Sequence, residues 1–315
     1  MASQVLHAGA AADRTAGLSQ NYAKLLEKAE LGRFVRSGDQ VAVKMHFGEP
    51  GNARYLRPIF PALLVDLLKS LGARPFVTDT AVLYKSLRHQ AYEYYDVARR
   101  NGFTSEVLGC PVIISGGLSD RSVKAPVPDP MRLQEVGISS EIYEADALIS
   151  LAHVTLHMQY PLGAALKNVG MGCVDIDTKT AMHDARGTNP RHLAQYEATC
   201  DGAKTVLTGF KCKFYAINLL LDITPDCDCF ERSDLPVVPD LGILSSDDPV
   251  AVDKASYDMI IAAPGYPGCK LEGSSGMNPG GPKVQPIYPK IDPEAYFQVT
   301  QRSGIGHTDY HLLDL

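Results

Sequence analysis

The sequence lacks an excess of basic residues, a long apolar run and an even number of cysteines, and each absence excludes a class of protein. Thirty Lys and Arg against 36 Asp and Glu leave a net charge of −6 over 315 residues, which gives no chain-wide attraction for a nucleic-acid backbone. No apolar run reaches the roughly 18 to 20 residues of a membrane span, and the first residues lack the layout of a secretory signal. Seven cysteines argue against a disulfide framework. We therefore expect a cytoplasmic protein without nucleic-acid or membrane partners, in an oligomeric state that the sequence leaves open.

Several cofactor and catalytic motifs are also missing. The sequence contains no helical two-histidine zinc motif, no nucleotide-binding P-loop, no complete dinucleotide fingerprint and no G-x-S-x-G nucleophile elbow. The spacing of Cys200, Cys212, Cys227 and Cys229 matches neither a zinc ribbon nor a bacterial-type ferredoxin run. The common metalloprotease, nucleotide-dependent and serine-hydrolase mechanisms are therefore not indicated.

What is present is the alternation of strands and helices that is typical of an α/β protein. The extended run 41–45 is followed by a helical pattern over 58–71, then by the strand-like run 74–79 and a helical pattern over 86–101. This order predicts a mostly parallel sheet flanked by helices, in which ligands bind beyond the carboxyl ends of the strands. A two-lobe arrangement with the site between the lobes is an alternative.

Other segments are predicted from local signals. Residues 1–18 are expected to be peripheral, Lys213–Leu221 is expected to be helical, and the Gly/Pro-rich segment 264–290 is expected to be a loop or flap. Aspartates followed by proline predict helix starts at Asp248 and at Asp292. We expect a single domain over 1–315, with a lobe boundary near 185–225 as the alternative.

Polar residues gather in the loop after the first predicted strand. His46, Asn52, Arg54 and Arg57 supply hydrogen-bond donors just before the helix that starts at Pro58, and helix N-termini bind anions readily. Asp79 ends the next strand and is expected on the same rim of the sheet. These residues predict a binding site for a cofactor or a small anion such as a carboxylate.

The stretch from His153 to His183 combines imidazoles and an amine with an otherwise apolar sequence. Lys167 lies among small and apolar residues, where it either extends to solvent or is desolvated with a lowered pKa and usable as a base or covalent amine. We predict catalytic roles for His153, His157 and Lys167. A single histidine in such a place is equally well explained as a structural hydrogen-bonding group.

The pair Cys227 and Cys229, separated by one aspartate, could bind a metal or form a redox site. We group this pair with His183 as candidate metal ligands. The alternative is that each cysteine is a small buried apolar residue.

Most of the chain resembles a known family. VAVKMHFGEPGN, PFVTDT, ADALISLAH, GAALKNVGMGC, CDC and VVPDLGILSSDDPVAVDKAS are similar to motifs of the uncharacterised iron–sulfur-centre proteins, domain-of-unknown-function family 362, over residues 40–183 and 225–262. Members commonly carry an inserted ferredoxin segment between the motif ending at His183 and the CDC motif. Here that segment is short and lacks clustered cysteines.

A more distant resemblance concerns the spacing of His157, Lys167 and His183, which is similar to that in lactate racemases. The resemblance implies a nickel-pincer nucleotide, tethered by Lys167, with nickel bound by His183 and His157 as an acid/base group. Arg54 or Arg57 would contact the cofactor phosphate. The segment TDTAVLY has no histidine where the racemase has one.

Two functions follow. The first is an enzyme, an isomerase or oxidoreductase, that transfers a proton or hydride on a small carboxylate-bearing molecule. The second is a non-catalytic metal or iron–sulfur carrier that uses Cys227 and Cys229.

Overall fold

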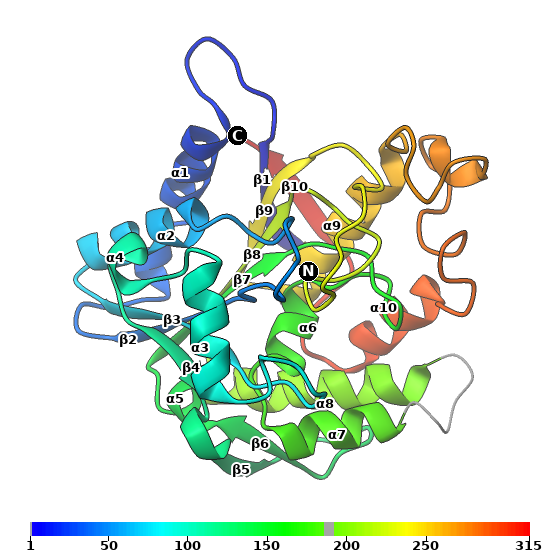
Figure 1. The fold of residues 1–315 in the computed structure, drawn as a ribbon. Coiled ribbons are helices and arrows are strands. Elements are labelled where there is room, and N and C mark those ends of the chain that lie inside the picture. The colour runs from blue at the N-terminus through cyan, green and yellow to red at the C-terminus, as the bar shows by residue number, and fades with distance from the viewer. Residues whose placement is uncertain (1, 186–191) are drawn as a thin grey trace.

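In the computed structural model, which describes residues 2–185 and 192–315, eight strands form one sheet in the order β10-β1-β9-β8-β7-β2-β3-β4 (Figure 1). The five strands from β8 to β4 are parallel, β9 is antiparallel to both of its neighbours, and β1 and β10 are parallel to each other. The predicted α/β fold with a mostly parallel sheet is confirmed. The strands are β1 (Ser3–Gly9), β2 (Gln40–Lys44), β3 (Arg74–Thr80), β4 (Val112–Ser115), β7 (Ala147–His153), β8 (Phe214–Leu220), β9 (Gly242–Ser246) and β10 (Tyr310–Asp314).

Helices cover both faces of this sheet, because successive side chains of a strand point to opposite faces. Val41 and Val43 of β2 pack in one apolar cluster with α1 and α2, whereas Ala42 belongs to the cluster on the other face with α6, α8 and α9. Figure 1 shows these two helical layers on either side of the strands. The helices are α1 (Leu18–Lys28), α2 (Ile59–Ser70), α3 (Ala91–Arg100), α4 (Ser105–Leu108), α5 (Ser140–Tyr143), α6 (Ala165–Gly170), α7 (Ile176–Ala185), α8 (Leu193–Phe210), α9 (Pro249–Ala262) and α10 (Pro293–Arg302).

The predicted helix at Lys213–Leu221 is wrong, because Phe214–Leu220 forms β8 in the middle of the sheet. All seven residues of β8 are buried, and a run that is apolar except for Asn218 does not show the period that separates a strand from a helix. The expectation that residues 1–18 are peripheral is also wrong for Ser3–Gly9, which pairs with β9 and β10. Both partners lie more than 230 residues further along the chain, so no local pattern shows the pairing.

The predicted helix starts near the C-terminus are confirmed. The Asp248 side chain accepts hydrogen bonds from the backbone of α9, and the Asp292 side chain does the same for α10. Between these helices, the Gly/Pro-rich segment 264–290 contains a short 3-10 helix, Ser275–Met277. The buried Lys283 ammonium donates to three backbone carbonyls and ties this segment to α9.

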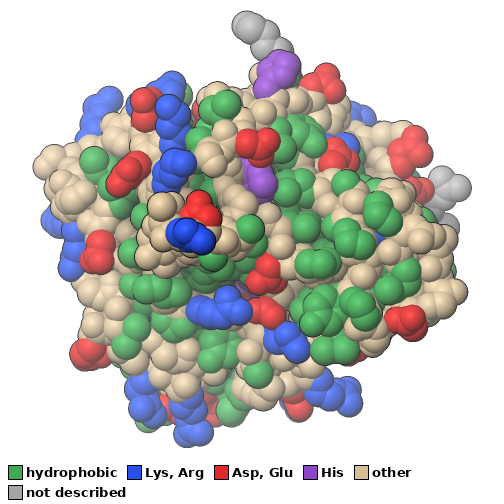
Figure 2. Space-filling view, turned by 90° about the horizontal axis from the view of Figure 1, so that it is seen from above, with side chains coloured by type: hydrophobic (Ala, Val, Ile, Leu, Met, Phe, Trp, Pro, Cys, Tyr) green, Lys and Arg blue, Asp and Glu red, His purple; other side chains and the backbone are tan. Residues whose placement is uncertain are grey.

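The predicted domain organisation stays a prediction. Residues 186–191 of the proposed lobe boundary lie outside the described part of the chain, and the rest of it contains α8 and β8. A small antiparallel pair, β5 (Ser122–Pro126) and β6 (Glu135–Ser139), forms a second sheet beside α5 and α7. None of the described helices is long and apolar enough to cross a bilayer. Basic and acidic side chains are interspersed over the face shown in Figure 2.

The order of the parallel strands determines where a ligand is expected. From β2 the chain continues to β3 and β4 on one side, whereas β7 and β8 extend the sheet on the other side of β2. The direction of winding therefore reverses between β2 and β7. In open α/β sheets, a crevice forms at such a switch point, outside the carboxyl ends of the strands.

Candidate functional site

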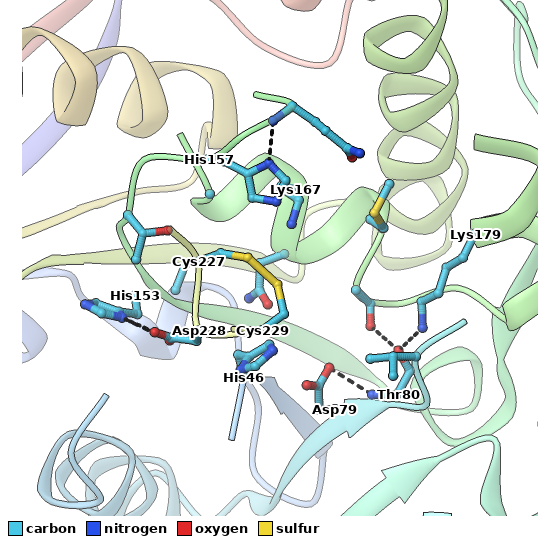
Figure 3. A pocket seen from close by; sticks show the side chains of 18 of the residues that line it. His46, Asp79, Thr80, His153, His157, Lys167, Lys179, Cys227, Asp228 and Cys229 are labelled. Carbon is cyan, nitrogen blue, oxygen red and sulfur yellow. Dashed lines mark hydrogen bonds and ion pairs between the residues drawn. A yellow bond between two sulfur atoms is a disulfide. The ribbon is translucent and has the colours of Figure 1, made fainter. Parts of the chain in front are cut away.

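A cavity of about 460 Å³ lies at this switch point, beyond the carboxyl ends of β2, β3 and β7 (Figure 3). Of the eleven site residues predicted from the sequence, the cavity wall contains eight. They are His46, Asp79, His153, His157, Lys167, His183, Cys227 and Cys229. The fold therefore brings together residues that lie up to 183 positions apart in the sequence.

The other three predicted residues, Asn52, Arg54 and Arg57, are outside this wall and join two loops. Arg54 and Arg57 donate to the two carboxylate oxygens of Asp222, at 2.9 and 2.6 Å. The Asn52 amide donates to the backbone carbonyl of Phe230 at 3.2 Å. The loop after β2 is thereby held against the segment that carries the two cysteines. The two arginines for which the resemblance implied a phosphate contact therefore lie outside the cavity wall.

An ion pair that the sequence did not indicate lies at the bottom of the cavity. The buried Lys44 ammonium is 2.8 Å from Asp79 Oδ1 and donates to Asn168 Oδ1 at 2.9 Å, while the Tyr94 hydroxyl donates to the other oxygen of Asp79. Burial by itself would raise the pKa of Asp79, but Lys44 and His46 lower it to about 2. Asp79 is therefore a charged partner for Lys44 and is not available as a proton donor.

A second unforeseen cation, Arg88, is almost completely buried beside His46. Its guanidinium donates to Glu49 Oε2 at 2.6 Å and to His46 Nε2 at 2.7 Å. Burial, together with the neighbouring positive charge of Arg88, lowers the pKa of His46 to about 3. His46 is therefore neutral and fixes one edge of the cavity.

Lys167 extends from α6 into the cavity, with its ammonium 5.6 Å from the centre of the Tyr160 ring. Within the described part of the chain, Lys167 Nζ makes no hydrogen bond and no ion pair. Burial and the nearby charges of Lys44 and Arg88 lower the pKa of Lys167 to about 8. Of the two alternatives that the sequence leaves open for Lys167, the lowered pKa favours the desolvated amine.

The position of α6 is fixed at its N-terminal end. The buried Asp253 carboxylate, from α9, accepts the backbone N–H groups of Ala165 and Leu166, both at 2.9 Å. These are two of the amides that a helix leaves unpaired at its start. Asp253 therefore positions the helix that carries Lys167.

Lys179, from α7, is a further cavity lysine that sequence reasoning missed. Its ammonium donates to Thr80 Oγ1 at 2.6 Å and to the Ala81 carbonyl, and no described carboxylate pairs with it. Burial lowers the pKa of Lys179 to about 8. Four lysine and arginine side chains and only two carboxylates line the cavity, so its wall has an excess of positive charge.

His153 and His157 are the two histidines among the predicted catalytic residues. The hydrogen-bond partners of each ring indicate which of its nitrogens carries a proton. His157 Nδ1 accepts the Gln159 N–H at 3.0 Å, so Nε2 carries the proton of a neutral ring. Burial and then the charge of Lys167 hold the pKa of His157 well below its usual value. His157 is consequently a hydrogen-bond donor at Nε2.

His153 differs from His157 in its protonation. Its Nδ1 lies 2.9 Å from both Asp228 oxygens and its Nε2 lies 2.7 Å from the Leu221 carbonyl, so each nitrogen has an acceptor and needs a proton. Burial opposes this charge, but Asp228 raises the pKa of His153 overall. His153 is therefore a buried imidazolium that holds the loop around Asp228.

The candidate metal ligands lie partly together. The His183 Nδ1–H donates to the Lys179 carbonyl at 2.8 Å. Cys227 and Cys229 form a disulfide, and their sulfur atoms and a ring nitrogen of His157 all lie within 4.8 Å of one another. Among the described residues, the histidine grouped with the two sulfurs is thus His157, and the metal role of His183 stays a prediction.

Comparison with known proteins identifies a family for this chain and finds solved structures with low similarity to it. The family profile described as "Domain of unknown function (DUF362)" matches residues 41–258. A search of curated protein sequences finds no match. The lactate racemase apoprotein from Thermoanaerobacterium thermosaccharolyticum aligns with 9% identity and a TM-score of 0.49, covering 82% of this chain and 57% of that one. A structural-genomics protein from Thermotoga maritima aligns with 10% identity and a TM-score of 0.38, over 64% of this chain and 50% of that one. The alignment with this chain therefore spans about half the length of each of these structures.

Proposed function

The chain belongs to the DUF362 family, which is defined by a domain of unknown function, and we therefore propose its function from the cavity itself. We propose that the protein is an enzyme that binds a small carboxylate-bearing molecule and transfers a proton or hydride on it. The observation that carries this proposal is the Lys167 amine, which lies in a positively charged cavity without a carboxylate partner.

The charges of the cavity favour an anionic ligand. Lys44 pairs with Asp79 and Arg88 donates to a glutamate, so these two cations are already compensated. Lys167 and Lys179 have no such partner among the described residues and can both attract a carboxylate. The cavity volume of about 460 Å³ lies within the range of roughly 300–1,000 Å³ that is usual for small-molecule sites.

The same groups support proton transfer. With a pKa of about 8, roughly a tenth of Lys167 is an uncharged amine at pH 7, which suits a general base or an amine nucleophile. The Nε2–H of His157 is a donor for negative charge that develops on a substrate oxygen. His153, which is charged and held on both nitrogens, has a positioning role in this proposal.

The nickel-pincer nucleotide that the resemblance implied fits these residues only in part. Lys167 and His183 line the cavity, but the arginines expected at its phosphate bind Asp222 instead. We therefore derive no step through that cofactor. The choice between isomerase and oxidoreductase, the cytoplasmic location and the lack of nucleic-acid or membrane partners stay predictions, as does the iron–sulfur carrier alternative.

The proposal is tested with single enantiomers of 2-hydroxy monocarboxylates, including lactate, in deuterated water. Chiral chromatography and NMR would follow the opposite enantiomer, the 2-oxo acid and deuterium at C2. We expect turnover by the wild type and a loss of about 100-fold or more in Lys167→Met, the usual effect of removing a general base. Lys24→Met, which removes an exposed lysine on α1, is the matched control. Turnover that is the same in both variants would contradict the proposal.

A further inference from the structure

The Cys227–Cys229 disulfide lies in the cavity wall rather than in a position that stabilises the fold. It joins residues only two positions apart, and the restraint that a disulfide places on an unfolded chain grows with the length of the closed loop. The loop is held by other contacts. Asp228 between the cysteines pairs with His153, and its carbonyl accepts the Glu49 N–H at 2.9 Å. The two cysteines therefore stay beside the cavity whether or not the S–S bond is present.

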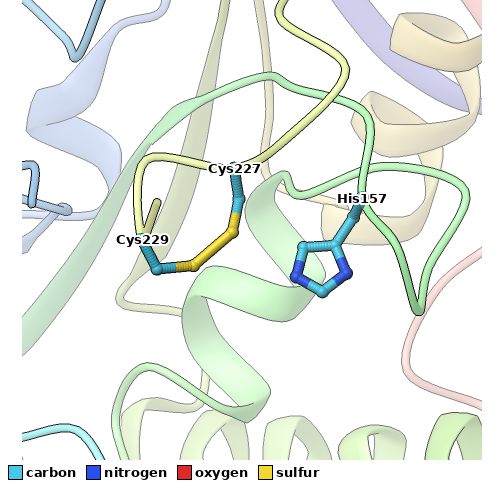
Figure 4. A group of neighbouring side chains, drawn as sticks. All are labelled: His157, Cys227 and Cys229. Atoms are coloured by element: carbon cyan, nitrogen blue, oxygen red, sulfur yellow. A yellow bond between two sulfur atoms is a disulfide. The ribbon is translucent and has the colours of Figure 1, made fainter. Parts of the chain in front are cut away.

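A third ligand group faces these sulfurs. Figure 4 shows the His157 ring turned toward Cys227 and Cys229. The ring nitrogen and both sulfurs lie within 4.8 Å of one another. In tetrahedral zinc sites, with Zn–S near 2.3 Å and Zn–N near 2.0–2.1 Å, ligand atoms are separated by roughly 3.4–3.8 Å. Once the S–S bond is broken, a small movement of the sulfurs would give this spacing.

We propose that Cys227, Cys229 and His157 form a site for a thiophilic divalent cation that is created when the disulfide is reduced. The inference goes beyond the proposed function and does not depend on it. The bound cation would take the place of the Nε2 proton of His157, so that nitrogen donates to a substrate only in the metal-free protein. Three protein ligands of the Cys₂His type leave a fourth position open, as in catalytic rather than structural zinc sites. That position faces the cavity, where a ligand oxygen or water could occupy it.

The disulfide is opened by a two-electron reductant. A phosphine becomes a phosphine oxide, and one water molecule supplies both its oxygen and the two thiol protons; a dithiol can act in its place. A dithiol transfers two electrons to the Cys227–Cys229 bond, which breaks to give two thiols while the dithiol forms its own disulfide. A divalent cation then binds two thiolates and releases two protons. The oxidised pair has no thiolate to offer, so the S–S bond and the cation exclude each other.

Coordination by His157 changes one existing hydrogen bond. Nδ1 now accepts the Gln159 N–H, and metal binding through Nε2 moves the ring proton to Nδ1. The Gln159 hydrogen bond is then lost, whereas three metal–ligand bonds are gained. We therefore expect the turn at Gln159 to rearrange when the cation binds.

The test compares two redox states of one sequence, so it does not depend on a variant that folds. Protein reduced with a phosphine, and protein with the disulfide intact, are titrated with Co²⁺ under anaerobic conditions. We expect one equivalent of Co²⁺ with thiolate-to-cobalt absorption in the reduced protein and none in the oxidised protein. Equal absorption in both states, or none in either, would overturn the proposal.

Variants then identify the ligands. Cys227→Ser and His157→Asn should each weaken Co²⁺ binding by more than about 100-fold, since even residues that only orient a metal ligand cost about 10–100-fold. Cys212→Ser removes an exposed thiol, and His183→Asn removes the other candidate histidine; both should bind as the wild type does. Loss of binding in His183→Asn with retention in His157→Asn would overturn the assignment. Lys167→Met should keep the cobalt spectrum, so failure of the proposed enzyme function is distinguished from failure of the metal site.

Discussion

Asp253 connects the stability of the fold to the position of Lys167, and its replacement gives a prediction with a magnitude. The carboxylate accepts hydrogen bonds from Ala165 and Leu166 at 2.9 Å and from the Asn218 side chain at 2.8 Å. Asp253→Ala would leave three donors without an acceptor in a region closed to solvent. At about 1–3 kcal/mol for each buried unsatisfied group, and with a water molecule replacing part of the loss, we expect about 3–5 kcal/mol of destabilisation.

Urea denaturation followed by circular dichroism measures this free energy. The matched control is Asp258→Ala on the same helix, where a partly exposed carboxylate pairs with Lys254 four residues earlier and accepts the Tyr310 hydroxyl at 3.0 Å. That surface pair is expected to contribute about 0–1 kcal/mol. If the free energy of unfolding of Asp253→Ala lies within about 1 kcal/mol of the wild-type value, the reasoning that Asp253 anchors α6 is refuted.

Three further predictions concern pH and close packing. Burial raises the folded-state pKa of Asp253 from 3.8 to about 7. Because the folded protein then binds the proton more tightly than the unfolded chain, the wild type should lose stability relative to Asp253→Asn as pH rises from about 4 to 7. A difference in unfolding free energy between the two proteins that is the same at pH 4 and pH 7 would contradict this. Gly172→Ala should destabilise by about 1–3 kcal/mol, because its Cβ would lie 2.2 Å from a carbonyl oxygen of α6. Gly209→Ala, with nothing within 4 Å, is the control and should be neutral or stabilising. Asp228→Asn should lower the pKa of His153, measured by NMR titration, because burial then acts without the opposing carboxylate; an unchanged titration would contradict the assigned ion pair.

The elements that could be predicted from the sequence are those with strong local signals. The helix after Pro58 has apolar residues at helical spacing and ends before Gly72, and it forms α2 as expected. The strand β8 was missed because its side chains are buried on both faces and show no alternation. The strand β1 was missed because its stability comes from pairing with β9 and β10 at the far end of the chain.

The residues of the site can likewise be divided into those with a local signal in the sequence and those without one. Lys167 and His157 could be found because polar groups in an apolar stretch are conspicuous in the sequence. Lys44 and Lys179 were missed because one occupies the last position of an apolar strand and the other an ordinary helical position. Only the tertiary fold directs both into the cavity. The neutralisation of Arg54 depends on Asp222, which lies 168 residues away and gives no local signal.

The central claim is that Lys167 attracts a carboxylate into the cavity, and the most direct measurement is the affinity for lactate and pyruvate as a function of pH. Lys167 is protonated below its pKa of about 8, so binding measured by calorimetry should be retained at pH 7 and weaken as pH rises above 8. Lys179 has a similar pKa, and Lys179→Met separates its contribution from that of Lys167. We predict that Lys167→Met binds more weakly than the wild type below pH 8 and keeps only the smaller pH dependence that Lys179 supplies. Binding that is unchanged in Lys167→Met, or constant from pH 7 to pH 10 in the wild type, would contradict the account.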